Sequence, residues 1–171
     1  MAIQMAKAHG AKVFVTVGGQ DKVDACLKLG ADAAINYKTE DFVARTKELT
    51  GGKGVDVILD MVGGDYIDRN YEAAAIEGRI VQIAFLGGSK ATPNFAKLMM
   101  KRLHHTGSTL RPRSVADKAA MVSAIEANAM PWLNDGRVKP LMDSSFPLKD
   151  ASKAHARMES SQHIGKIVLV V

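Results

Sequence analysis

Short apolar runs alternate with amphipathic stretches along about the first 110 residues of the chain. The runs are rich in β-branched residues, a composition that predicts buried strands at residues 12–18, 33–37, 55–62, 79–85 and 107–111. The stretches between them predict helices at residues 2–9, around 23–29, and at 40–50, 65–77 and 94–104. Short strands that alternate with helices are typical of βαβ units, so the pattern predicts an α/β fold with a parallel sheet.

Several residues suit the ends of these helices. Gly10 is placed to end the first helix as a left-handed cap, and Gly30 follows the second. Asp65 is the expected N-cap of the helix at 65–77. A longer helix begins near residue 115 and is predicted to bend or end near Pro131.

The last part of the chain departs from this regular winding. An extended stretch with two prolines is followed by a helix and a final strand, at residues 138–148, 150–161 and 165–171. We therefore expect residues 1–136 to form one domain and residues 137–171 to form a separate C-terminal segment.

Composition narrows the class of protein more than the function. The 171 residues are enough for one sizeable core, and 47% of them are hydrophobic. Lys and Arg outnumber Asp and Glu by 23 to 18, which suits a ligand that carries phosphate; a basic surface without a special role is the alternative. The basic residues are scattered and aromatic residues are few, so nucleic-acid binding gains no support.

Cysteine and membrane signals point to a cytoplasmic protein. Cys26 is the only cysteine, so an internal disulfide and a thiolate zinc cluster are excluded. No apolar run approaches the roughly 20 residues that a membrane span needs. His104 and His105 are adjacent and point in different directions in a helix or a strand, so we expect no metal site there. Asp56 and Asp60 are interpreted as structural residues and not as an acid–base pair.

An ordered set of motifs resembles the nucleotide-binding half of the medium-chain dehydrogenase/reductase superfamily. The motifs are M-A-I-Q-M-A-K-A-H-G-A-K-V, L-G-A-D-A-A-I-N-Y, G-V-D-V-I-L-D-M-V-G-G, G-R-I-V-Q-I-A, G-S-T-L-R-P-R-S and H-I-G-K-I-V-L-V-V. Within that superfamily the chain is most similar to the zinc-free quinone oxidoreductases. The resemblance covers essentially the whole chain. It implies a Rossmann-like, doubly wound parallel sheet and a short tail that normally packs with a catalytic domain.

Two parts of the family pattern do not occur in the sequence: the catalytic domain, and the first Rossmann strand with its glycine-rich pyrophosphate loop. Without that strand the sheet would have two unpaired edges facing one gap. Three explanations stay open. The chain is a fragment that begins at an internal Met, another chain supplies the strand, or the final strand pairs in a new place. We expect a homodimer or a larger homo-oligomer.

The stretch V-T-V-G-G-Q-D-K at the end of the second expected strand bears on the choice of cofactor. NAD enzymes place a carboxylate there to bind the ribose hydroxyls, whereas this chain has two glycines and a lysine. The resemblance implies that Gly18, Lys22 and Tyr37 form a pocket for the 2′-phosphate of NADPH. A plain turn with a solvated lysine is the alternative, and Asp21 could still reach a ribose hydroxyl.

Further cofactor contacts are implied where later strands end. The resemblance places Val62 and Gly63 close to the cofactor, and it places Phe85 and Leu86 near the nicotinamide. A turn that only caps the next helix, and apolar packing at a strand end, are the respective alternatives.

The branch-specific motif T-L-R-P-R-S and the late H-I-G-K-I motif complete the implied site. Leu110 and Arg111 would lie near the nicotinamide and its phosphates, and Lys166 would be a late cofactor contact. For the basic residues, exposed positions without a ligand are the alternative. Ser114 is interpreted as a helix cap and not as a catalytic hydroxyl.

The resemblance implies an NADPH-dependent oxidoreductase that transfers hydride to a quinone or a similar activated carbonyl, with activity impaired in this chain. The cofactor carries the chemistry, and no residue present is a credible general acid or base. Two other functions stay open: a non-catalytic structural or dimerising remnant, and an enoyl or alkenal reductase of the same superfamily.

Overall fold

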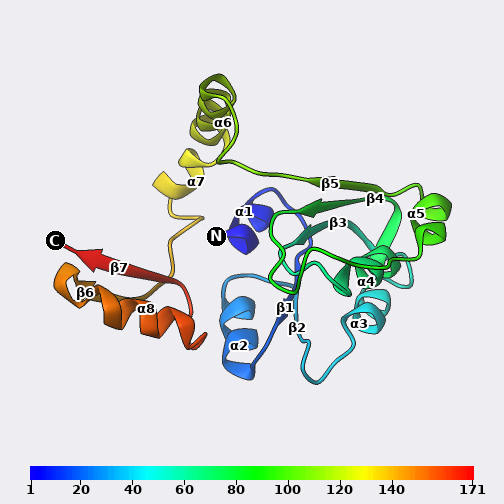
Figure 1. The fold of residues 1–171 in the computed structure, drawn as a ribbon, viewed down its shortest axis with the longest axis horizontal. Helices are drawn as coiled ribbons and strands as arrows, with labels where there is room; N and C mark the ends of the chain where they lie inside the picture. Colours follow the sequence, from blue (N-terminus) through cyan, green and yellow to red (C-terminus); the bar gives the residue numbers. More distant parts are fainter. The chain divides into compact units, whose positions relative to one another are not determined.

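The computed structural model describes all residues from 1 to 171, which divide into two compact units. One unit contains residues 1–34 and 121–171, and the other contains residues 35–120. The strands form three sheets, with the orders β1–β2, β3–β4–β5 and β6–β7 (Figure 1). The domain boundary that we expected after residue 136 stays a prediction.

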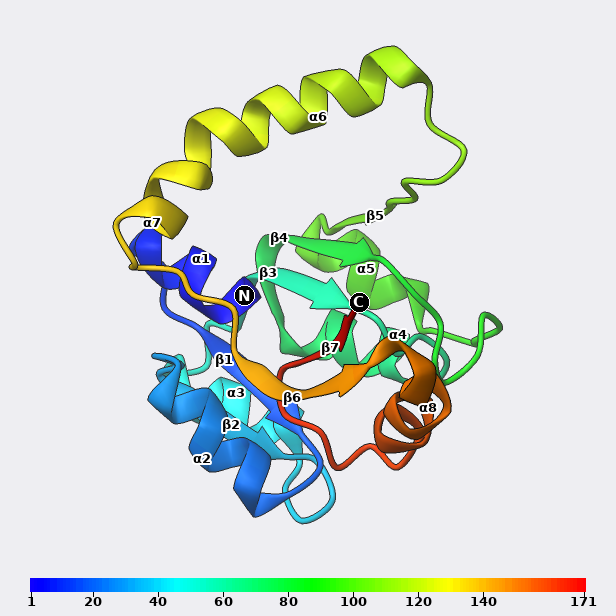
Figure 2. The same cartoon turned by 90° about the vertical axis from the view of Figure 1, so that its left-hand side faces the viewer.

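The unit of residues 35–120 is built on a three-stranded parallel sheet. Its strands are β3 (Val55–Asp60), β4 (Ala74–Gln82) and β5 (His104–Gly107), and its helices are α3 (Phe42–Leu49), α4 (Tyr66–Ala73) and α5 (Phe95–Lys101). Figure 2 shows β3 and β4 side by side and pointing the same way. In register, Ile58 lies opposite Ile80, and Ile80 lies opposite His105. The α/β fold with parallel strands that the sequence predicted is therefore confirmed.

The two faces of this sheet have different environments. Ile80 and Tyr71 are almost fully buried in one apolar cluster, against which Ile58 packs. The opposite face carries Val57 and Leu59, whose exposed fractions are 62% and 53%. Because side chains alternate along a strand, Ile58 and the buried Asp60 share one face of β3, and Val57 and Leu59 lie on the other.

The other unit holds the remaining elements. They are α1 (Ala2–Ala8), β1 (Phe14–Val17), α2 (Gln20–Lys28), α7 (Met130–Asn134), β6 (Met142–Pro147), a 3-10 turn at Leu148–Asp150, α8 (Ala151–Glu159) and β7 (Lys166–Val170). The strand β2 (Ala33–Asn36) and the helix α6 (Val115–Asn128) cross the boundary between the units. Strands β6 and β7 pair in parallel. Within this unit the Gln4 side chain exchanges two hydrogen bonds with the backbone of Lys139.

Most local predictions are confirmed, and the exceptions have physical causes. Gly10 has φ +81°, as expected for a left-handed helix end. The helix expected at 65–77 ends at Ala73, because Ala74 and Ala75 are already buried in the extended start of β4. Asp65 was expected to cap α4, but its side chain makes no capping bond, since its backbone is already helical.

The strand expected at 107–111 was wrong. The strand is β5 at His104–Gly107, and only Gly107 is shared with the expected range. Its residues lack an apolar pattern because most of them are exposed, and pairing with Arg79–Gln82 of β4 defines the strand instead. No helix of the molecule is long and apolar enough to cross a lipid bilayer.

Candidate functional site

Two loops lie at the carboxyl edge of β3 and β4, where ligands bind in open α/β sheets. The loop 61–64 follows β3 and the loop 83–88 follows β4. Three backbone bonds join them: Leu86 N to Met61 O at 3.0 Å, Gly87 N to Val62 O at 2.7 Å, and Gly64 N to Gly88 O at 2.8 Å. The two loops are thus paired almost as strands are, and we call them the paired loops.

The glycines of the first loop are required by this pairing. Gly63 has φ +69° and Gly64 has φ +52°, both in the left-handed region. A Cβ atom on Gly63 would lie 2.6 Å from Gly88 O, and a Cβ atom on Gly64 would lie 2.7 Å from Gly87 O. Close approach of the second loop therefore demands glycine at both positions, whether or not a cofactor also approaches them.

A buried polar cluster lies beneath the paired loops. Asp60, the last residue of β3, accepts hydrogen bonds from Val62 N at 2.6 Å and from Gly63 N at 3.3 Å, and Asn70 Nδ2 of α4 donates to it at 3.0 Å. Gln82, the last residue of β4, donates through Nε2 to Asp60 O at 3.3 Å and to Ala84 O at 2.6 Å. Asp60, Asn70 and Gln82 are all buried.

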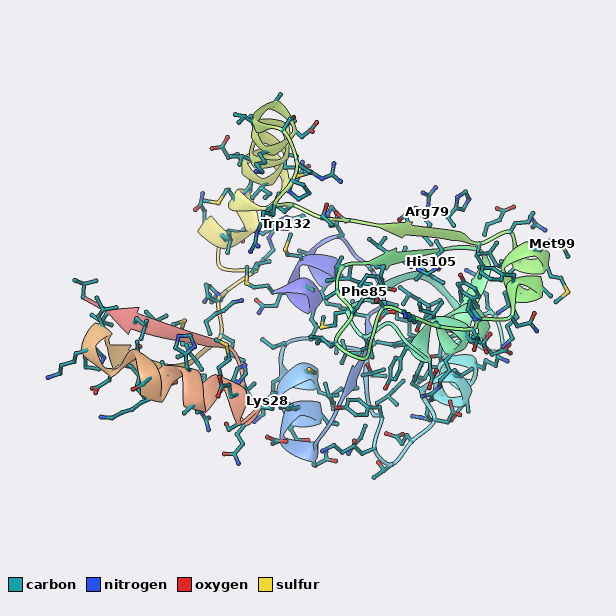
Figure 3. The ribbon with its side chains drawn as sticks, viewed as in Figure 1. Lys28, Arg79, Phe85, Met99, His105 and Trp132 are labelled. Atoms are coloured by element: carbon teal, nitrogen blue, oxygen red, sulfur yellow. The ribbon has the colours of Figure 1, made fainter.

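The side chains expected to face the nicotinamide are exposed at this edge. Phe85, labelled in Figure 3, is 50% exposed, and Leu86 is 80% exposed. Val62 is half-buried in the first loop. The unit of residues 35–120 therefore brings Val62, Gly63, Phe85 and Leu86 together on the paired loops.

Leu110, Arg111 and Tyr37 belong to the same unit but lie outside the paired loops. Leu110 is 61% exposed, and Arg111 is exposed and its guanidinium makes no hydrogen bond. Tyr37 follows β2 and is 46% exposed. No hydrogen bond or ring contact joins these three residues to the paired loops.

Gly18 lies in the turn from β1 to α2, and Lys22 lies in the first turn of α2, both in the other unit. The turn has the expected form, with Gly19 as the N-cap of α2. Lys22 is already engaged, because its Nζ atom donates to Ser161 O at 2.6 Å. The Asp21 carboxylate folds back over the turn, and a Cβ atom on Gly19 would lie 2.7 Å from Asp21 Oδ1.

Lys166 begins β7 in the same unit, and its side chain is exposed. A carboxylate holds the preceding loop: Asp143 accepts from Ile164 N at 2.9 Å and from Arg157 Nη2 at 2.8 Å. Hydrogen bonds from the Arg157 guanidinium, from Ile164 N and from Ser144 hold the pKa of Asp143 well below its usual range. Asp143 thus fixes the loop that leads into β7 and Lys166.

Sequence analysis did not identify the buried polar cluster. Asp60 was interpreted only as structural, and Asn70 and Gln82 were not singled out. One signal was available: polar residues end both apolar strand runs, and each is followed within six residues by a Gly-Gly pair. Polar side chains at adjacent ends of parallel strands are well placed to organise the loops that follow.

The residues present offer two kinds of surface that a nicotinamide dinucleotide requires. Lys22 provides a cation beside a glycine turn, which suits a phosphate, and the exposed Phe85 and Leu86 suit a planar ring. The sequence has no G-x-G-x-x-G loop for the pyrophosphate. The structure contains no group of three or more His, Cys, Asp or Glu residues arranged to hold a metal ion.

Comparison with known proteins decides the family. Residues 1–127 match the model of the zinc-binding dehydrogenases. The chain belongs to this family. The medium-chain dehydrogenase/reductase superfamily that the motifs indicated is thereby confirmed.

Relatives in this family include quinone and alcohol oxidoreductases. Quinone oxidoreductase 1 of Escherichia coli is 34% identical over 171 residues, which are 99% of this chain and 52% of that protein. The crystal structure of Escherichia coli quinone oxidoreductase complexed with NADPH matches with a TM-score of 0.83 and 34% identity over 99% of this chain and 52% of that one. An NAD-dependent alcohol dehydrogenase matches with a TM-score of 0.79 and 32% identity, over 99% and 47%.

These relatives support a coarse function and leave its details open. The chain is homologous to NAD(P)-dependent oxidoreductases and matches their Rossmann-like half. It spans about half the length of the relatives that it matches. One of the solved relatives is described with NADPH and another as NAD-dependent, so the choice of cofactor has to be argued from this chain's own residues.

Proposed function

We propose that the chain is the cofactor-binding half of an NADPH-dependent oxidoreductase that reduces a quinone or a similar activated carbonyl. The paired loops carry the proposal. They present Phe85 and Leu86 at the carboxyl edge of a parallel sheet, on a backbone that hydrogen bonds already hold in shape. A surface that is formed before binding loses less conformational entropy when a ring is placed on it.

NADPH would supply the hydride, and the protein would supply position and protection from water. Phe85 and Leu86 would contact the nicotinamide, and Val62 and Gly63 would border it. Leu110 and Arg111 would close the site from the loop after β5. None of these residues would act as a general acid or base.

At the adenosine end, we propose that Gly18, Lys22 and Tyr37 accept the 2′-phosphate. Lys22 is the main support, because an ammonium beside a glycine turn favours a phosphate over a hydroxyl. Lys166 would be a further cofactor contact. The proposed enzyme is a cytoplasmic homodimer or larger homo-oligomer that binds a small quinone or enone.

A second candidate function is a scaffold without turnover. The bond from Lys22 to Ser161 O favours it, because a phosphate would have to displace or share that bond.

Calorimetry with NADPH and NADH on the 171-residue chain separates the candidates. We expect binding of NADPH at least about tenfold tighter than that of NADH, since a charge-assisted bond contributes on the order of 1.5 kcal/mol. Lys22→Gln should abolish this preference, and Lys28→Gln, at the exposed far end of the same helix, should retain it. NADPH oxidation with an added quinone then tests turnover. Equal or absent binding of both cofactors would leave the scaffold as the function.

A further inference from the structure

We propose that Asp60 and Gln82 are positioning residues that hold the paired loops as one rigid body beneath Phe85 and Leu86. The inference rests on the proposed function for its catalytic meaning, whereas the coupling of the loops rests on the hydrogen bonds of this unit. Neither residue would touch the cofactor. Each would act through the backbone that carries the contacting side chains.

Asp60 sets the shape of the first loop. Its carboxylate accepts from two successive backbone N–H groups, of Val62 and Gly63, and from the Asn70 amide. Its exposed fraction is 4%, and no cation pairs with it. A buried carboxylate that depends on N–H groups is stable only while the turn aims those groups at it, so it selects one loop conformation.

Gln82 joins the first loop to the second. Its Nε2 atom lies between two carbonyl oxygens, Asp60 O and Ala84 O, so the orientation of its amide is determined by the two acceptors. Its Oε1 atom is buried and has no partner, although the residue is only 6% exposed. An unpaired buried acceptor is costly, and a Leu would avoid that cost. We infer that the amide serves to place Ala84, the residue before Phe85.

Together the two residues and the backbone bonds form a closed ring of hydrogen bonds. Asp60 holds Val62 and Gly63; the first loop binds Leu86 and Gly87 through the backbone; and Gln82 ties Ala84 back to Asp60. A change at any point is therefore transmitted to both loops. The same hydrogen bonds fix the backbone that carries Phe85 and Leu86, whose side chains are exposed.

Amide hydrogen exchange on the unliganded chain tests the coupling. We expect Gln82→Met, which keeps the side-chain length and removes the donors, to speed exchange at Leu86, Gly87 and Gly64 by at least about fivefold. Exchange inside β3 and β4, at Ile58 and Ile80, should not change. Gln162→Met is the control, because Gln162 is exposed and its side chain makes no hydrogen bond.

Uniformly faster exchange over the whole sheet would mean a merely structural role and would overturn the proposal, as would no change at all. Asp60→Asn is the second variant if Gln82→Met does not fold. It keeps a side-chain oxygen and turns one acceptor into a donor that faces Asn70, so it should loosen the same amides.

Cofactor binding tests the positioning role separately. NADPH should bind Gln82→Met at least about fivefold more weakly, whereas 2′,5′-ADP, which lacks the nicotinamide, should bind both proteins equally. Loosened loops with unchanged NADPH affinity would overturn the positioning role. If Gln82→Met shows the expected change in exchange but the unmodified chain binds no NADPH, the proposed function fails while the loop coupling is confirmed.

Discussion

Two nearly buried carboxylates, one in each unit, hold loops that carry expected cofactor contacts, and they do so with different partners. Asp60 is bound by backbone N–H groups of the next few residues and by the Asn70 amide. Asp143, whose side chain is 7% exposed, is bound by the Arg157 guanidinium, by Ile164 N and by the Ser144 hydroxyl. One carboxylate is satisfied by neutral dipoles and the other by an ion pair.

The difference shows two ways of fixing a strand end. Asp60 reaches residues two and three positions away, so it shapes a single turn at the carboxyl edge of the sheet. Asp143 reaches residues 14 and 21 positions away, so it joins β6, α8 and the loop before β7. The first arrangement depends mainly on the backbone geometry of one turn, and the second depends on an ion pair between distant residues.

The largest effect is expected when the neutral network is broken. Asp60→Ala leaves the N–H groups of Val62 and Gly63 and the Asn70 amide buried without their acceptor, which should lower the free energy of unfolding by about 3 kcal/mol. Urea denaturation measures this change. Asp56→Ala on the same strand is the control, because Asp56 is exposed and pairs only with the exposed Lys53. Equal losses for the two variants would show that the network contributes little.

A smaller effect is expected from filling the space between the paired loops. Gly63→Ala places a Cβ atom against Gly88 O and imposes a left-handed residue, which should cost about 2 to 3 kcal/mol of unfolding free energy. Gly51→Ala shares the left-handed conformation, with φ +60°, but its Cβ atom would meet nothing within 4 Å, so it should cost only about 1 kcal/mol. Urea denaturation of both variants measures the two losses of unfolding free energy. Their difference isolates the contact between the loops. A difference near zero would mean that the second loop moves away freely.

The smallest effect is expected when acid protonates Asp143, the ion-paired carboxylate. The pKa of Asp143 is lower in the folded chain than its ordinary value of 3.8, so its charge stabilises the fold fully above that value. This stabilisation is lost as the pH falls below 3.8 towards the lower folded-state pKa. Urea denaturation from about pH 2 to about pH 7, which includes this acid window, should give a flatter acid dependence for Asp143→Asn.

The control for acid unfolding lies on the same helix as Arg157. Glu159→Gln changes an exposed carboxylate that makes no hydrogen bond or ion pair, so its acid dependence should follow that of the unmodified chain. Identical curves for Asp143→Asn and the unmodified chain would show that the Arg157 pair does not respond to pH in this range.

The sequence by itself determined the class of fold, the order of the elements and the family. The strands β1, β2 and β3, and the helices α3 and α8, fall within the ranges that apolar periodicity predicted, because periodicity is a property of neighbouring residues. The glycine pairs at 63–64 and 87–88 also marked the loops where strands end.

The tertiary structure alone decided how those loops are held. Gln82 binds Asp60 O across 22 positions, and Lys22 binds Ser161 O across 139 positions. Neither bond can therefore be predicted from the pattern of neighbouring residues in the sequence. The same holds for β5, which begins at His104 because β4 offers a partner there and not because its own residues are apolar. Burial and hydrogen-bond partners depend on which distant segments contact one another, and these contacts form only when the chain folds.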